Sequence, residues 1–149
     1  MNKKKFVSIA QEVINLEIQA LQKLKKNINS SFSEAVIEIA KCQSKVITCG
    51  VGKSGLIASK IAATLSSVGI SSFYLNPGEA NHGDLGQIDK RDVLLVFSYS
   101  GNTSEITNML KYANRFNIKI IGVASKKESV LLKASDISIL LPKVKEDDT

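Results

Sequence analysis

Residues 46–55 are Val46-Ile47-Thr48-Cys49-Gly50-Val51-Gly52-Lys53-Ser54-Gly55, a short β-branched run followed by a turn with three glycines, a lysine and a serine. Apolar residues return at helical spacing from Ser54 to Val68, so this part of the chain predicts a strand, a tight turn and a helix. Such a turn directs backbone N–H groups outward, and the positive end of the helix dipole adds to them. The sequence therefore predicts an anion site, most naturally for phosphate, with Lys53 supplying a full charge.

Two known glycine motifs come close to this turn. A nucleoside-triphosphate P-loop also ends in Gly-Lys-Ser, but Ile47 stands where its first glycine is required. The dinucleotide fingerprint G-x-G-x-x-G is met by Gly50, Gly52 and Gly55, yet residues 75–77, Leu-Asn-Pro, bring no acidic residue to the end of the second strand. The P-loop interpretation fails, and dinucleotide binding is only a minor alternative.

Composition limits the class of protein. A chain of 149 residues suffices for one domain with a sizeable core, and its 44% hydrophobic and 23% charged residues are ordinary for a globular protein. No apolar run approaches the ~20 residues that span a bilayer, and the basic N-terminus lacks the apolar region of a signal peptide, so we expect a cytoplasmic protein and no membrane partner. The net charge of +6 is dispersed and only 5% of residues are aromatic, which disfavours nucleic acid as a partner.

Cysteine and histidine are too few for a disulfide framework or a built metal centre. Cys42 and Cys49 lack metal-ligand spacing, and the chain has a single histidine. We expect buried or incidental thiols, no cofactor and no dedicated metal site.

Two helices are expected before the first strand. Apolar residues recur at near-helical spacing across residues 5–28, and Ser31 or Ser33 can cap a second helix. The apolar face of that second helix would consist of Ala35, Val36, Ile39 and Ala40. The first helix carries more apolar surface than one domain needs, so it packs either on its own domain or on a second subunit.

From Val46 onward, short β-branched runs alternate with helical ones, which is typical of a parallel sheet covered by helices on both faces. The expected strands are 46–50, 71–75, 93–98, 119–124 and 137–141, and the expected helices are 54–68, 103–116 and 128–134. The helix 54–68 would bury Ile57, Ile61, Leu65 and Val68 and end at Gly69. The predicted fold class is α/β, a three-layer α/β/α sandwich with a five-stranded parallel sheet. Residues 1–149 would form one domain, with N-terminal helices in 1–45 and the α/β core in 46–149.

Ligands of such sheets bind beyond the carboxyl ends of the strands, where the strand order reverses. The loops after the first three strands hold the densest polar cluster of the chain: Lys53, Ser54, Glu79, His82, Asp84, Ser98, Ser100, Asn102, Thr103 and Glu105. Residues 98–105 place several hydroxyls and backbone amides at the start of a helix. One hydroxyl, of Ser100 or Thr103, is enough to cap that helix. The presence of further hydroxyls in the same turn favours phosphate binding.

Three motifs, in this order, resemble the sugar isomerase (SIS) domain of the bacterial arabinose-5-phosphate isomerase family. They are Gly-Val-Gly-Lys-Ser-Gly at 50–55, Pro-Gly-Glu-Ala-Asn-His-Gly-Asp-Leu-Gly at 77–86 and Ser-Tyr-Ser-Gly-Asn-Thr-Ser-Glu at 98–105. The resemblance implies a five-stranded α/β/α sandwich and a homo-oligomer, dimer or tetramer, with active sites at subunit contacts. It also implies interconversion of ribulose 5-phosphate and arabinose 5-phosphate for lipopolysaccharide biosynthesis.

The resemblance also implies site residues. The catalytic residues of the family correspond to Lys53, His82, Glu105 and Glu146, and its phosphate-binding and substrate-binding residues to Gly52, Ser54, Ser98, Ser100 and Thr103. Family members continue into a further helix with another histidine, and many carry paired CBS modules. The sequence given stops at Thr149 before these elements, so the prediction is of a truncated isomerase whose own activity is open.

The chemistry can be stated without the family. Moving a carbonyl between C1 and C2 of a sugar phosphate needs a base that shuttles a proton through a cis-enediol, and donors that stabilise the enediolate. A carboxylate whose pKa is raised by burial suits the base, and either Glu105 or Glu146 could supply it unless both are ordinary surface residues. Lys53 could bind the phosphate or the enediolate, and His82 could open the sugar ring, hold an adventitious metal ion or fix its loop. The competing interpretation is a module that senses a sugar phosphate without turnover.

Overall fold

The computed structural model describes residues 3–80 and 83–144 of the chain. The helix α1 (Lys3–Asn27), Ile28 and residues 142–144 belong to one compact unit, and Asn29–Leu141 form the other, which contains the sheet. Within the described ranges, no helix is both long and apolar enough to cross a membrane.

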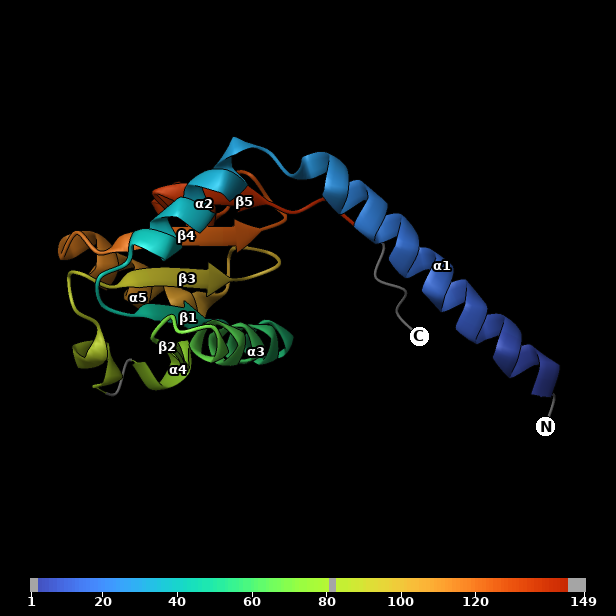
Figure 1. The fold of residues 1–149 in the computed structure, drawn as a ribbon, viewed down its shortest axis with the longest axis horizontal. Coiled ribbons are helices and arrows are strands. Elements are labelled where there is room, and N and C mark those ends of the chain that lie inside the picture. Colours follow the sequence, from blue (N-terminus) through green and yellow to red (C-terminus); the bar gives the residue numbers. More distant parts are fainter. Residues whose placement is uncertain (1–2, 81–82, 145–149) are drawn as a thin grey trace. The chain divides into compact units, whose positions relative to one another are not determined.

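The sheet-containing unit alternates strands with helices (Figure 1). Its elements are α2 (Ser30–Lys41), β1 (Val46–Cys49), α3 (Lys53–Ser67), β2 (Ser72–Leu75), α4 (Pro77–Ala80), the 3-10 helix η1 (Asp84–Gln87), β3 (Val93–Phe97), α5 (Ser104–Arg115), β4 (Lys119–Ala124), α6 (Val130–Ala134) and β5 (Ile137–Leu140). All five strands are parallel, in the order β2-β1-β3-β4-β5. The predicted α/β fold with two N-terminal helices is confirmed, and each predicted strand and helix lies within two residues of its observed bounds.

Each face of the sheet has its own hydrophobic core, because successive side chains of a strand point to opposite faces. One core lies against α4, α5 and α6 and includes Ile47 and Leu94. The other lies against α2 and α3 and includes Val46 and Val93. Strand β3 is buried apart from its last residue, Phe97, as its wholly apolar sequence predicts for a central strand.

Helix α3 buries small residues instead of the large ones predicted. Its buried residues are Gly55, Ala58 and Ala62. Ile61 and Leu65 are half-buried against the sheet, but Ile57 and Val68 are exposed, so the prediction was wrong for these two. The small residues let α3 approach β1 closely enough for the hydroxyl of Thr48 to donate a hydrogen bond of 2.8 Å to the carbonyl of Ala58.

Helix α2 is capped by Asn29 and not by Ser31 or Ser33. The Asn29 side-chain oxygen accepts a hydrogen bond of 2.9 Å from the amide of Ser31. Of the predicted apolar face, Ala35 is buried and Ile39 half-buried, whereas Val36 and Ala40 are exposed. Helix α2 packs on β5 at the edge of the sheet, and Ala35 and Ile39 are the residues of the predicted face that join the core on that side.

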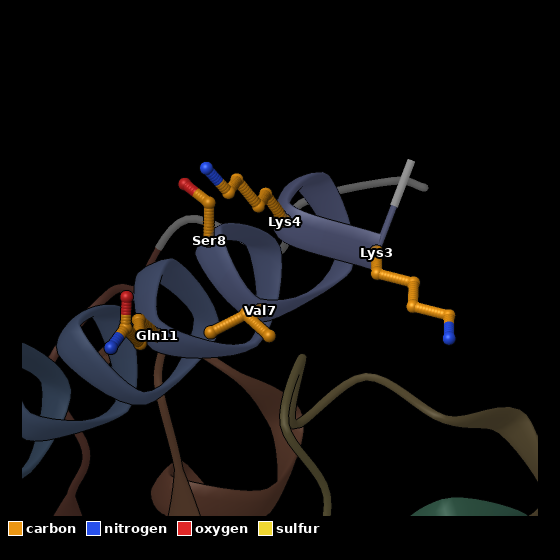
Figure 2. A pocket seen from close by; sticks show the side chains of 5 residues that line it. All are labelled: Lys3, Lys4, Val7, Ser8 and Gln11. Carbon is orange, nitrogen blue, oxygen red and sulfur yellow. The ribbon is translucent and has the colours of Figure 1, made fainter. Parts of the chain in front are cut away.

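Helix α1 has no buried residue among those described. Eight of its large apolar side chains are at least 42% exposed: Phe6, Val7, Ile9, Val13, Ile14, Leu16, Ile18 and Leu21. A shallow depression near its start is lined by Lys3, Lys4, Val7, Ser8 and Gln11, and Lys3 and Lys4 point away from each other (Figure 2). All five lining residues come from one helix, so the depression is not an enclosed site.

Candidate functional site

The strand order brings the two glycine-containing turns together. Strand β1 pairs with β3 in register, Cys49 opposite Val96, and β1 also pairs with β2, Cys49 opposite Leu75. The chain leaves β1 toward β2 on one side and β3 toward β4 on the other, so the strand order reverses between β1 and β3. The turns 50–52 and 98–103 follow these two neighbouring strands, at the place where open α/β sheets bind ligands.

The first turn is held by close backbone contacts. A Cβ on Gly50 would lie 2.7 Å from the carbonyl group of Ser54, and a Cβ on Gly55 would lie 2.7 Å from the Tyr74 hydroxyl. That hydroxyl donates a hydrogen bond of 2.8 Å to the Gly50 carbonyl. The turn thus depends on glycine at both positions, and it delivers the exposed Lys53 as the first residue of α3.

The second turn, residues 98–103, is held by one pair of hydroxyls and by two bonds from backbone amides to hydroxyls. Ser98 is buried, and its hydroxyl lies 2.8 Å from that of Thr103 and accepts a bond of 3.1 Å from the Gly101 amide. The hydroxyl of Ser100 accepts a bond of 3.2 Å from the Asn102 amide. The three predicted phosphate-binding residues, Ser98, Ser100 and Thr103, therefore lie in one short turn.

Neither Ser100 nor Thr103 caps α5 with its side chain. Thr103 occupies the N-cap position but makes no side-chain cap, and its hydroxyl lies 2.8 Å from that of Ser98 instead. The first amides of α5 consequently receive no acceptor from these two hydroxyls, and the positive end of the helix dipole is directed at whatever binds in front of it. This arrangement favours anion binding over a simple capping role.

Glu105 is the second residue of α5, and it is exposed. The Ser104 hydroxyl donates a hydrogen bond of 2.8 Å to its carboxylate, and this bond, together with the amide of Glu105 itself, holds the pKa of Glu105 below its usual value. The sequence predicted a catalytic base whose pKa is raised by burial, and Glu105 in this structure has neither the burial nor the raised pKa.

Comparison with known proteins identifies the family and agrees with the fold. Residues 38–149 match the SIS domain. The chain belongs to the SIS domain family. It is 41% identical over 143 residues to the arabinose 5-phosphate isomerase KdsD of Francisella tularensis, an alignment that covers 94% of this chain and 44% of that protein. It is 38% identical over 141 residues to KdsD of Escherichia coli K12, covering 95% of this chain and 43% of that protein.

Among solved structures, the SIS domain is similar to the E. coli CFT073 protein c3406 in complex with arabinose 5-phosphate, with a TM-score of 0.91 and 35% sequence identity. The match covers 97% of this chain and 77% of that one. The chain spans less than half the length of the two curated relatives named above.

Two of the predicted catalytic residues of this SIS domain, His82 and Glu146, lie outside the described residues. The thiol of Cys49 is buried, and burial raises its pKa far above the usual value, whereas Cys42 is half-buried. This agrees with the prediction of a buried thiol at Cys49.

Sequence reasoning missed three residues that shape the two turns: Tyr74, Ser125 and Ser129. Tyr74 bonds Gly50 across 24 residues and Ser125 bonds Tyr99 across 26, so neither has a local signal. Ser129 did have one, because a serine directly before the apolar run 130–132 is a typical N-cap.

Proposed function

We propose that this SIS domain binds the phosphate group of a five-carbon sugar phosphate at the turn 98–103. We further propose that it belongs to an isomerase that interconverts ribulose 5-phosphate and arabinose 5-phosphate, for lipopolysaccharide biosynthesis. The observation that carries the proposal is a turn rich in hydroxyls in front of an α5 N-terminus that Thr103 leaves without a side-chain cap. The names of the KdsD relatives and the sugar phosphate bound to the structural relative support the choice of sugar.

In this proposal, Ser98, Ser100 and Thr103 bind the phosphate oxygens, with Gly52 and Ser54 of the first turn lining the other side. Lys53 is exposed and has no ion-pair partner among the residues that the structure describes. Its ammonium is thus available for the phosphate or for the enediolate oxygen that develops in the reaction.

The isomerisation itself moves one proton between C1 and C2 through a cis-enediol, and the base that carries it is Glu105 or Glu146. Glu105 is ionised near neutral pH, as its lowered pKa dictates, so it can accept a proton without prior deprotonation. We assign ring opening or loop positioning to His82, in line with the resemblance.

The binding test compares arabinose 5-phosphate with unphosphorylated arabinose in thermal unfolding. A ligand that binds only the folded chain raises Tm, so the phosphorylated sugar is expected to raise it clearly more. Ser100→Ala and Thr103→Val are each expected to weaken binding by about 1 to 3 kcal/mol, the usual value of a hydrogen bond to a charged oxygen. Equal shifts with both sugars, or no shift with either, would contradict a phosphate site.

The catalytic test uses Glu105→Gln, which changes charge without changing size. If Glu105 is the base, exchange of the C2 hydrogen of arabinose 5-phosphate falls about 10² to 10⁴-fold while binding stays nearly intact. Proportional losses of binding and exchange would make Glu105 a positioning group and direct the search to Glu146. Binding without exchange in the unmutated chain would favour the sensing module, unless a longer form of the protein regains exchange.

We also propose that the chain is a homo-oligomer in which α1 packs on a second copy, and that it works in the cytoplasm as a single SIS domain. Helix α1 exposes eight large apolar side chains, which favours a partner for that face. Light scattering is expected to give a mass above that of the 16.1 kDa monomer at micromolar concentration. A purely monomeric mass would contradict the assembly and leave the phosphate site unaffected.

A further inference from the structure

One polar side chain of the turn 98–103 has no role in the proposed function. Asn102 is exposed, and its side-chain oxygen accepts a hydrogen bond of 2.9 Å from the amide of Val130, 28 residues further along the chain. Val130 is the first residue of α6. Asn102 therefore adds a second side-chain acceptor at the start of α6, whose N-cap residue is Ser129, and no pattern within the turn would indicate this contact.

The same neighbouring segment, residues 125–131, which follows β4 and includes the first two residues of α6, binds two carbonyls of the turn. The Leu131 amide donates to the Gly101 carbonyl at 2.9 Å. The Ser125 amide and hydroxyl both donate to the Tyr99 carbonyl, at 2.9 Å and 2.7 Å. The turn is thus attached to segment 125–131 at three of its positions, 99, 101 and 102.

Close packing at Gly101 also holds the turn against the residues before α6. Gly101 has a φ of +66°, and a Cβ placed on it would collide with the Ser129 side chain and lie 3.1 Å from the Ala124 Cβ. The backbone of the turn is therefore pressed against the start of α6 without space for a side chain between them. An outward shift of the turn would break the bond between Asn102 and Val130.

This attachment has a chemical consequence for an anion. Carbonyl oxygens repel a phosphate, and two carbonyls of the turn are occupied by donors from segment 125–131. These two carbonyls are therefore not left as unpaired acceptors beside the hydroxyls of the turn. A turn held in this way before binding also avoids the ordering cost that a mobile loop would incur on binding.

We propose that Asn102 is a positioning residue that, by capping α6, holds the turn 98–103 in its phosphate-binding conformation without contacting the ligand. This inference rests on the proposed function of the turn. It predicts a loss of affinity on removal of a side chain that makes no contact with phosphate.

The test is Asn102→Ala, with the dissociation constants of inorganic phosphate and arabinose 5-phosphate measured by calorimetry well below the melting temperature. The matched control is Asn29→Ala, since Asn29 is also an exposed asparagine that caps a helix, through one bond of 2.9 Å. Each variant loses one side-chain hydrogen bond of 2.9 Å to an amide at the start of a helix, so both are expected to lower Tm by similar amounts. Only Asn102→Ala is expected to weaken arabinose 5-phosphate binding, by about tenfold, with Asn29→Ala within about twofold of the unmutated chain.

Asn102→Asp separates the cap from other effects, because a carboxylate still accepts from Val130 but adds a charge near the phosphate. At about 0.5 M salt, where exposed charges are screened, it is expected to recover most of the affinity that Asn102→Ala loses. If Asn102→Ala does not fold, Ser125→Ala, which removes only the hydroxyl bond to Tyr99, replaces it with a loss in the same direction.

The inference would be overturned if Asn102→Ala bound arabinose 5-phosphate within about twofold of the unmutated chain. It would also be overturned if Asn29→Ala lost as much affinity as Asn102→Ala, or if Asn102→Asp recovered none of the lost affinity. Each of these results would leave the proposed phosphate site unaffected. If the unmutated chain binds neither ligand, the proposed function is wrong and the inference falls with it. The two failures are therefore distinguishable in one set of titrations.

Discussion

Replacing Gly101 by alanine is expected to be among the most destabilising single-methyl changes in this chain. At a φ of +66° an alanine must adopt a left-handed backbone, which costs about 1 to 2 kcal/mol. Its Cβ would also collide with the Ser129 side chain and press on the Ala124 Cβ at 3.1 Å, and overpacking of this kind costs about 1 to 3 kcal/mol. The sum is a loss of about 2 to 5 kcal/mol in the free energy of unfolding.

Gly69→Ala is the matched control. Gly69 follows the end of α3 at a φ of +88°, and a Cβ there would meet nothing within 4 Å, so only the backbone strain applies. Urea unfolding followed by circular dichroism measures both variants, and the slope with urea should not change. Gly101→Ala is expected to lose about 1 to 3 kcal/mol more than Gly69→Ala, or roughly 2 to 12 °C more in Tm. Equal losses would refute the tight contact between the turn and α6.

Two further predictions concern buried groups. A disulfide reagent is expected to label Cys42 in the folded chain but to label Cys49 only as fast as the chain unfolds. The reason is that burial hides the Cys49 thiol and raises its pKa, which suppresses the reactive thiolate. Rapid labelling of both cysteines would contradict the burial of Cys49. Asp92→Ala is expected to lower the free energy of unfolding, measured with urea, by about 2 to 5 kcal/mol. The buried carboxylate of Asp92 accepts hydrogen bonds from the amides of Lys45 and Asp89, at 3.1 Å and 2.7 Å, and pairs with the Lys45 ammonium at 3.3 Å. A loss below about 1 kcal/mol would mean that water replaces these bonds.

The alternation of strands and helices could be predicted because it depends on local periodicity. Strand β3 is wholly apolar and β4 is nearly so, and Gly69 marks the end of α3 as a C-terminal glycine does. The buried face of α3 could not be predicted in the same way. Hydrophobicity favours Ile57 and Val68, whereas close packing on β1 selects Gly55 and the alanines, and this choice depends on the neighbouring strand.

The candidate site also has a part that local sequence predicts and a part that depends on tertiary contacts. The hydroxyls of Ser98, Ser100 and Thr103 are neighbours in sequence, so a phosphate-binding turn could be predicted from the residues alone. The attachment of that turn by Asn102 and Ser125 depends on contacts across 26 to 28 residues, which become visible only once β3 and β4 are paired. Local sequence thus predicts a ligand for the turn, and the tertiary structure shows which bonds attach the turn to residues 125–131.

The lowered pKa of Glu105 bears on its proposed role as the catalytic base. Its carboxylate accepts from the Ser104 hydroxyl and from its own amide, so a negative charge already lies at the N-terminus of α5, where the phosphate is proposed to bind. A phosphate dianion placed there would repel this carboxylate and compete for the same donors. Both effects disfavour the charged form of Glu105, and both therefore raise its pKa from the lowered value that the Ser104 bond gives it. Binding of arabinose 5-phosphate is thus expected to make Glu105 a stronger base at the moment when the sugar is in place. Carboxyl-carbon NMR titration with and without the ligand measures this change, and a pKa that stays low in the bound chain would assign the proton shuttle to Glu146 instead.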